Sequence, residues 1–367
     1  MIRRSNGGYI LSERLWIEKR PSLRVAVRLL AQSSTFRKSH VKTGIVAVLL
    51  ALGCPIYGAH SSPGRFASSD KSPGRDWVMT WDDEFNGPNG SPPDKNRWVT
   101  ETGANRWGNH ELEYYTARSQ NLRQEDGHLV IEARKEEFTG SDGVAGHYTS
   151  ARIITHGLFS QAYGRFEARI KVPFGQGMWP AFWLLGDDFY KAGWPACGEI
   201  DIMENSGAMK STIRSSLNGP GYWDTQAITS SFTLPHGHFS DDFHVFAVEW
   251  APELIRFYVD DQLYATRTPA DLPNGSRWVF DHPFFVVLNL AVGGNLPGRP
   301  DSSTVFPQRM LVDYVRVYSR GKVNSGAAGD GGWRRGAEGG SRESGILLPA
   351  IYPSFTKRSV LAFFRNN

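Results

Sequence analysis

The sequence predicts an all-β fold: an antiparallel β-sandwich of the jelly-roll type with a concave substrate groove. Three observations within residues 76–320 lead to this prediction. There are many short runs rich in β-branched and aromatic residues, glycine and proline lie between the runs, and no stretch keeps a helical period. A chain of many short strands buries its apolar faces by packing one sheet on another.

The strand signals follow one another along the chain. The run RFEARIKV places Phe166, Ala168, Ile170 and Val172 on one side and four charged residues on the other, which is typical of a strand. Further strands are expected at 244–250, 255–260, 262–266, 284–292 and 311–318. The Asp260-Asp261 pair is expected to form the turn of a hairpin.

Composition divides the chain into four parts. These are an N-terminal extension with a secretory signal (1–59), a linker (60–75), a folded domain (76–320) and a Gly-rich tail that is expected to be disordered (321–367). The signal is predicted from an apolar stretch that follows Arg37, Lys38 and Lys42. The protein is therefore expected to be secreted or periplasmic. A lipoprotein anchor at Cys54 is a less favoured alternative, because proline follows the cysteine.

The basic residues are concentrated at the two ends. The chain has 41 Lys and Arg against 37 Asp and Glu. Residues 1–75 carry 13 against 3 and residues 321–367 carry 7 against 3, which leaves 21 against 31 in the folded domain. A nucleic-acid partner is therefore not expected. Without the signal Cys197 has no partner, so no disulfide is expected and a buried apolar role is favoured.

Three carboxylates lie in the otherwise apolar stretch GEIDIMENSG (198–207). In an extended chain Glu199 and Asp201 share one face, whereas Glu204 is one residue out of step. A β-bulge at Ile202 or Met203 would bring Glu204 to the face of the other two acids. The alternative is an exposed strand edge with arginine partners. The apolar flank MWPAFWLL and the lack of Lys or Arg between 191 and 210 favour a functional cluster.

Several aromatic residues lie next to glycines and polar residues rather than in apolar runs. Aromatic rings in a groove stack on the apolar faces of sugar rings, while nearby polar groups bind the hydroxyls. For each of these residues, packing in the core remains the alternative. The residues are Trp107, Tyr114, Tyr115, Trp179, Trp183 and Trp223.

EIDIME (199–204) is similar to the active-site motif of family 16 of the glycoside hydrolases, in the form with an extra residue before the last glutamate. Six other segments share the resemblance: WDDEFNG (81–87), WGNHELEYYT (107–116), SARIIT (150–155), GMWPAFWLLG (177–186), LNLAVGGN (288–295) and MLVDYVRVY (310–318). Together they resemble the bacterial laminarinase-type members, which cleave β-1,3-glucans internally.

The resemblance implies a β-jelly-roll enzyme that hydrolyses a polysaccharide with retention of configuration. Glu199 would be the nucleophile and Glu204 the general acid and base. Asp201 would hold Glu199 by a hydrogen bond, and the crowd of negative charge would keep Glu204 protonated. No cofactor for catalysis and no partner protein are implied, and a monomer is expected.

The resemblance also implies roles for residues outside the motif. Trp179 and Trp183 would line sugar subsites, while Asn109, Arg152 and Trp107 would contact the substrate on its non-reducing side. A structural calcium ion is implied on the opposite face of the fold. Its ligands would be Glu84, the carbonyl of Gly127 and Asp313, although two acids in salt bridges would look the same in the sequence.

One position departs from the family pattern. Many laminarinase-like members carry a histidine after the catalytic strand, where this chain has Asn218 in SLNGPGYW. An amide cannot carry charge, so a changed pH profile or subsite preference is expected. A mixed-linkage β-1,3/1,4-glucanase, a transglycosylase and a non-catalytic β-glucan recognition module remain alternatives.

Overall fold

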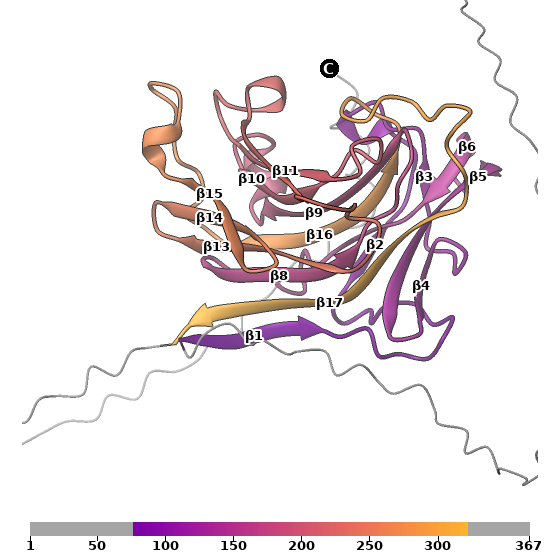
Figure 1. Cartoon of the computed structure of the whole chain (residues 1–367), viewed down its shortest axis with the longest axis horizontal. Coiled ribbons are helices and arrows are strands. Elements are labelled where there is room, and N and C mark those ends of the chain that lie inside the picture. The colour runs from indigo at the N-terminus through magenta and orange to yellow at the C-terminus, as the bar shows by residue number, and fades with distance from the viewer. Residues whose placement is uncertain (1–75, 322–367) are drawn as a thin grey trace, which may run out of the picture. The chain divides into compact units, whose positions relative to one another are not determined.

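Two stacked β-sheets make up residues 76–321, the part of the chain that the computed structural model describes (Figure 1). The predicted N-terminal extension, signal and linker, and the tail from residue 322, lie outside the described residues. Within this range, no helix has the length and apolar character needed to cross a membrane.

Ten strands form one sheet, in the order β15-β14-β13-β8-β17-β5-β6-β3, with β1 paired to β17 and β4 to β5. All its described pairs are antiparallel except β3 with β6, which is parallel. The strands are β1 (Trp77–Asp83), β3 (Tyr114–Tyr115), β4 (Leu122–Glu125), β5 (His128–Thr139), β6 (Ala145–Ser150), β8 (Gly164–Lys171), β13 (His244–Ala251), β14 (Leu254–Val259), β15 (Gln262–Arg267) and β17 (Gln308–Arg320).

The other sheet has seven strands in the order β12-β11-β10-β9-β16-β7-β2, and all its pairs are antiparallel. The strands are β2 (Val99–Glu101), β7 (Arg152–Ile154), β9 (Met178–Gly186), β10 (Glu199–Glu204), β11 (Thr212–Asn218), β12 (Ile228–Thr233) and β16 (Phe284–Val292). The described helices are short: α1 (Phe189–Ala192) and 3-10 turns at Arg106–Gly108, Asp224–Gln226 and Pro269–Asp271. The predicted all-β sandwich is therefore confirmed.

The strands predicted from alternation are present. The run RFEARIKV forms β8, and the predicted strands at 244–250 and 284–292 form β13 and β16. Between β14 and β15, Val259 pairs with Gln262, and the two turn residues Asp260 and Asp261 have φ of 49° and 65°. Left-handed φ at both central positions is the mark of a type I′ hairpin turn, so the predicted hairpin is confirmed.

The apolar core lies between the two sheets. It contains Leu184 and Ile200 of the seven-stranded sheet and Phe166 and Ile170 of the ten-stranded sheet. Leu185 belongs instead to a smaller apolar cluster with Cys197, and successive residues of a strand point to opposite faces. This second cluster therefore lies on the outer face of the seven-stranded sheet. Cys197 is buried as expected, and burial raises the pKa of its thiol to about 12.

A β-bulge interrupts β10 where it was predicted. Against β9, Asp201 pairs with Trp183 and Met203 with Phe182, so Ile202 is the additional residue. Ile202 and Met203 both point into the core, where they are 1% and 0% exposed. The bulge therefore returns Glu204 to the outer face, which is the face of Glu199 and Asp201.

Candidate active site

A continuous row of paired residues crosses the seven-stranded sheet on its outer face. Residues that are directly opposite each other in a ladder share a face. The row runs through Ser231, Arg214, Glu204, Ala181, Asn289, Arg152 and Glu101. In the neighbouring rows Asp201 pairs with Trp183, and Glu199 pairs with Asn218. The register thus brings the three predicted acids together with Trp183, Arg152 and Asn218.

Glu199, at the start of β10, receives hydrogen bonds on both carboxylate oxygens. The Nδ2 of Asn218 donates to Oε1 over 2.8 Å, and the indole Nε1 of Trp194 donates to Oε2 over 3.1 Å. Burial and the negative charge of Glu204 raise the pKa of Glu199 to about 7, although these donors favour the ionised form. The carboxylate is thus held in place and titrates near neutral pH.

Asp201 lies between the two glutamates and shares the amide of Asn218, whose Nδ2 is 3.0 Å from its Oδ2. Burial, followed by the charges of Glu199 and Glu204, raises the pKa of Asp201 well above its usual range. A protonated Asp201 donates a hydrogen bond to Glu199. This arrangement agrees with the predicted hydrogen bond between the two acids.

Glu204 has a different environment from the other two acids. The Nε1 of Trp179 donates to its Oε1 over 3.0 Å, and the guanidinium of Arg214 lies 3.3 Å from its Oε2. Burial raises the pKa of Glu204, whereas Arg214 and Trp179 oppose the rise. The direction agrees with the prediction, and burial is the largest cause; the repulsion between Glu199 and Glu204 acts on the coupled pair in the same direction.

A stack of one arginine and two tryptophans lies on the other side of β10. The guanidinium of Arg152 is 4.9 Å from the ring centroid of Trp107 and 4.8 Å from that of Trp183, and it pairs with Glu101. Asn289 of β16 accepts a hydrogen bond of 2.8 Å from the indole of Trp183. The structure therefore brings together three residues that were predicted separately, and it fixes both rings.

The loop that carries Trp107 and Asn109 has an unusual backbone. Arg106, Trp107 and His110 all have positive φ, at 65°, 45° and 59°. Side chains disfavour this region, and such strain persists only where the surroundings hold it in place. Here Asn109 accepts from the backbone N–H of Asn295, and Gly294 packs so closely on Trp179 that any side chain would collide with the ring. The loop is thus anchored beside the acids.

Two of the predicted sugar platforms are wrong. Tyr115 is 0% exposed and Tyr114 is 6% exposed, so both rings are largely buried; Trp179, predicted to line a subsite, is also only 9% exposed. The sequence cannot separate a buried aromatic residue near glycine from an exposed one. Trp223 is exposed as predicted, and its ring centroid lies 5.4 Å from that of Trp194.

Sequence reasoning also missed residues that contact the acids or the tryptophans of the site. Trp194, Arg214 and Asn289 were not predicted, although each binds a predicted site residue. Arg214 lies on β11, the next strand along the chain after β10. Its position opposite Glu204 depends on the bulge and the pairing register, which only the folded sheet shows.

The predicted calcium ligands already have partners. Arg316 forms a bidentate pair with Glu84 at 2.7 and 3.0 Å, and Arg169 lies 2.7 Å from Asp313. Gly127 is in the turn between β4 and β5. Within residues 76–321, no group of three or more acidic, histidine or cysteine side chains is placed to hold a metal. This donor set fits ion pairs better than a calcium site, and calcium stays an untested prediction.

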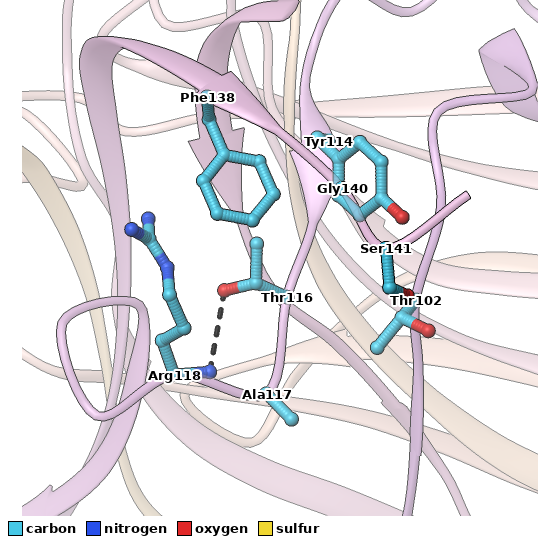
Figure 2. A pocket seen from close by; sticks show the side chains of 8 residues that line it. All are labelled: Thr102, Tyr114, Thr116, Ala117, Arg118, Phe138, Gly140 and Ser141. Carbon is cyan, nitrogen blue, oxygen red and sulfur yellow. Dashed lines mark hydrogen bonds between the residues drawn. The ribbon is translucent and has the colours of Figure 1, made fainter. Parts of the chain in front are cut away.

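A surface pocket of about 410 Å³ lies apart from the acids (Figure 2). Tyr114 and Phe138 contribute rings to its lining, and the backbone N–H of Arg118 donates to the hydroxyl of Thr116. The lining contains no carboxylate. This pocket therefore offers no carboxylate as a general acid or base.

A two-sheet fold with acids on a bulged strand, flanked by tryptophans, defines a class of carbohydrate-active enzyme. The family model described as glycosyl hydrolases family 16 matches residues 109–316. The chain belongs to this family. It is a glycoside hydrolase with the jelly-roll fold.

Three relatives show which members of the family this chain is similar to. A beta-glucanase of Rhodothermus marinus is 39% identical over 275 residues, which are 73% of this chain and 91% of the relative. A glucan endo-1,3-beta-glucosidase of Cryptopygus antarcticus is 40% identical over 256 residues, 66% of this chain and 92% of the relative. The solved catalytic domain of an endo-1,3-beta-glucanase (laminarinase) from Thermotoga petrophila is 47% identical, with a TM-score of 0.63, and the match covers 67% of this chain and 98% of that domain.

Proposed function

We propose that the protein is an endo-acting hydrolase of β-1,3-glucan that retains configuration, with Glu199 as nucleophile and Glu204 as general acid and base. The observation that carries the proposal is the β10 bulge, which places Glu199, Asp201 and Glu204 on one face beside Trp179 and Trp183. The names of the relatives supply the substrate class.

In the first step, the carboxylate of Glu199 attacks the anomeric carbon while Glu204 gives its proton to the glycosidic oxygen. The bond between that carbon and oxygen breaks, and the sugar on the leaving side departs as an alcohol. In the second step Glu204, now a carboxylate, takes a proton from water. The resulting oxygen nucleophile attacks the same carbon and releases Glu199.

The electrostatics of the two glutamates suit these roles. The charge of Glu204 is one cause of the raised pKa of Glu199. This repulsion disfavours a double charge, so the pair shares one proton, and the first step needs that proton on Glu204. Arg214, 3.3 Å from Glu204, stabilises the carboxylate that the second step needs.

The closing experiment combines activity with chemical rescue. We expect the purified protein to release reducing sugars from laminarin, and Glu199→Ala and Glu204→Ala to lose that activity, whereas the exposed control Glu253→Gln keeps it. With an aryl glucoside oligomer of good leaving group, azide should rescue Glu199→Ala to an α-glycosyl azide and Glu204→Ala to a β-glycosyl azide. Release from lichenan, agarose or carrageenan in place of laminarin would refute the substrate class, and exchanged azide products would refute the roles.

A second activity, transfer to a sugar acceptor, is favoured by one observation. Trp194 and Trp223 are 41% and 45% exposed, form an edge-to-face pair, and lie beside Glu199 and Asn218. An exposed ring pair at this position offers a platform for a sugar, which would compete with water for the glycosyl-enzyme. Oligosaccharides longer than the substrate would reveal transfer, and their loss in Trp223→Ala would connect it to this pair.

Export is part of the proposal, and it is inferred from the apolar stretch 44–59 and the preceding basic residues. Export would bring the enzyme to a polysaccharide outside the cell. Fusion of residues 1–75 to a reporter that is active only after export would test this. A reporter that stays in the cell would contradict it.

A further inference from the structure

Two buried glutamates behind the predicted sugar subsites have no part in the reaction described above. Glu111 is 6% exposed and Glu113 is 1% exposed, just before and at the entry to β3. Two carboxyl groups rarely share a buried site without a function or a shared proton, because both desolvation and mutual repulsion disfavour a double charge. Their hydrogen bonds lead directly to residues that were predicted to bind substrate.

Glu111 is the acceptor at the centre of a chain of hydrogen bonds. The hydroxyl of Tyr115 donates to its Oε2 over 3.0 Å, and the side chain of Asn109 also bonds to it. The Nδ2 of Asn289 donates to the same hydroxyl over 3.1 Å. The Oδ1 of Asn289 in turn accepts the indole N–H of Trp183 at 2.8 Å. Glu111 thus connects to Asn109 directly and to Trp183 through two side chains.

Glu113 has contacts that suit a protonated acid. Its Oε2 accepts the backbone N–H of Val292 over 2.7 Å, and its Oε1 is buried without any donor. A proton on Glu113 gives the pair a hydrogen bond to the carboxylate of Glu111. Burial, then the charge of Glu111, raises the pKa of Glu113 well above its usual range. Burial raises the pKa of Glu111 as well, but less than that of Glu113, because the hydrogen bond with Glu113 and the charge of Arg152 oppose the rise. The single proton of the pair therefore lies on Glu113 and the charge on Glu111.

We propose that the anionic Glu111, beside a protonated Glu113, is a positioning residue that orients Asn109 and Trp183 for the non-reducing side of the substrate. The inference rests on the proposed function, because it assigns these two residues to sugar subsites. Glu111 touches no reacting atom, so it acts only through the groups that it holds.

The charge on Glu111 matters as well as its shape. Glu111 accepts hydrogen bonds from Tyr115, Asn109 and Glu113, and a carboxylate has acceptor sites for all three. The amide of a glutamine has only one acceptor oxygen, and its two hydrogens would face donors. Arg152 on β7, which pairs with Glu101 on β2, is the cation that favours the ionised Glu111. Arg152 also stacks on Trp183, so Glu111 acts on that ring through Arg152 as well as through Asn289.

The test uses the full chain and a set of matched variants. In Glu111→Gln we expect the KM for laminarin to rise about tenfold or more while kcat changes little, because the subsites are misplaced but the acids are not. Glu113→Gln keeps a donor to Glu111 and an acceptor for Val292, so its KM for laminarin should stay close to that of the parent. Glu132→Gln removes a buried carboxylate on the ten-stranded sheet and should lower stability without raising KM.

A second readout does not depend on activity. The indole N–H resonance of Trp183, assigned by its loss in Trp183→Phe, should shift in Glu111→Gln and in Tyr115→Phe but not in Glu132→Gln. Tyr115→Phe removes only the connecting hydroxyl, so it tests the link between Glu111 and Trp183 even if Glu111→Gln does not fold. An unmoved resonance, or a fall in stability with KM unchanged, would overturn the inference. Inactivity of the parent on every glucan would refute only the proposed function. The shift of the Trp183 resonance would then still show whether Glu111 positions that ring.

Discussion

At the scale of single residues, the side-chain amide of Asn218 connects two of the three acids. The Nδ2 of Asn218 donates to Glu199 and Asp201, and its Oδ1 accepts the backbone N–H of Asp224 over 3.2 Å, which fixes the amide orientation. Asn218 was predicted as a substrate contact in place of a histidine. In the structure, both of its amide hydrogens point at the acids.

Replacement of Asn218 by alanine should therefore change catalysis through the acids. Loss of the donors disfavours the ionised form of Glu199 and raises its pKa further above about 7. We expect the acidic limb of kcat/KM to move to higher pH and the maximum to fall about tenfold or more, since a hydrogen bond to a charged group contributes roughly 1.5–3 kcal/mol. Asn218→His should move the profile because its side chain titrates.

The measurement is the pH profile of laminarin hydrolysis by the parent and both variants. Asn96→Ala removes an exposed amide far along the chain from β10 and serves as the control. Identical profiles for the parent, Asn218→Ala and Asn218→His would contradict this role for the amide.

The acids and their bulge were predictable from residue order, because strand alternation shows which residue is out of step. The partners Trp194 and Arg214 were not, because their contacts join segments that the sequence does not place side by side. For Tyr114 and Tyr115, glycines nearby in the sequence suggested exposure, but Tyr114 is buried against Gly140, a glycine distant in the sequence, where any side chain would collide with its ring.

Strands of the ten-stranded sheet carry ion pairs where a calcium ion was predicted. The pair Glu84–Arg316 joins the end of β1 to β17, and Asp313–Arg169 joins β17 to β8. A cation would have to displace both arginines. Arginines of the same sheet therefore neutralise both carboxylates.

Removal of calcium should accordingly leave the fold unaffected. We expect the same Tm after dialysis against EDTA and after addition of calcium chloride, because both carboxylates are already paired. Calorimetry of the parent and Arg169→Met in both buffers would check this, with the variant less stable in each. A Tm that rises by several degrees with calcium in the parent would contradict the ion-pair reading and support the predicted ion.

At the level of elements, prediction succeeded where strands alternate clearly and failed where the alternation is weak or the pairing is non-local. The strand β11 reads TIRSSLN: Arg214, Ser216 and Asn218 face the site, and Ser215 separates the core residues Ile213 and Leu217, so the apolar period is weak. The parallel pairing of β3 with β6 joins residues 35 positions apart, Tyr114 with Thr149. Neither feature follows from local propensity.

Six buried acids of the domain bind protons more strongly than they would in the unfolded chain. Among the described acids, a raised pKa is found for Asp83, Glu111, Glu113, Glu199, Asp201 and Glu204, and burial is the largest cause in each. A carboxyl whose folded pKa exceeds its unfolded value stabilises the fold fully below the unfolded value, about 4. That contribution is lost as pH rises through the folded pKa.

Stability should therefore fall between about pH 5 and pH 8, the window set by the unfolded value and by the pKa of Glu199, about 7. Chemical denaturation at each pH would give the free energy of unfolding. Glu199→Gln and Glu113→Gln each remove an acid whose folded pKa is raised, so each should flatten this slope. For Glu199 the total fall in the free energy of unfolding over the window should shrink by at most about 3 kcal/mol. The exposed control Glu253→Gln should keep the slope of the parent. A free energy that rises with pH over this window would mean that the acids are ionised in the fold at little cost, and that their burial does not govern the site.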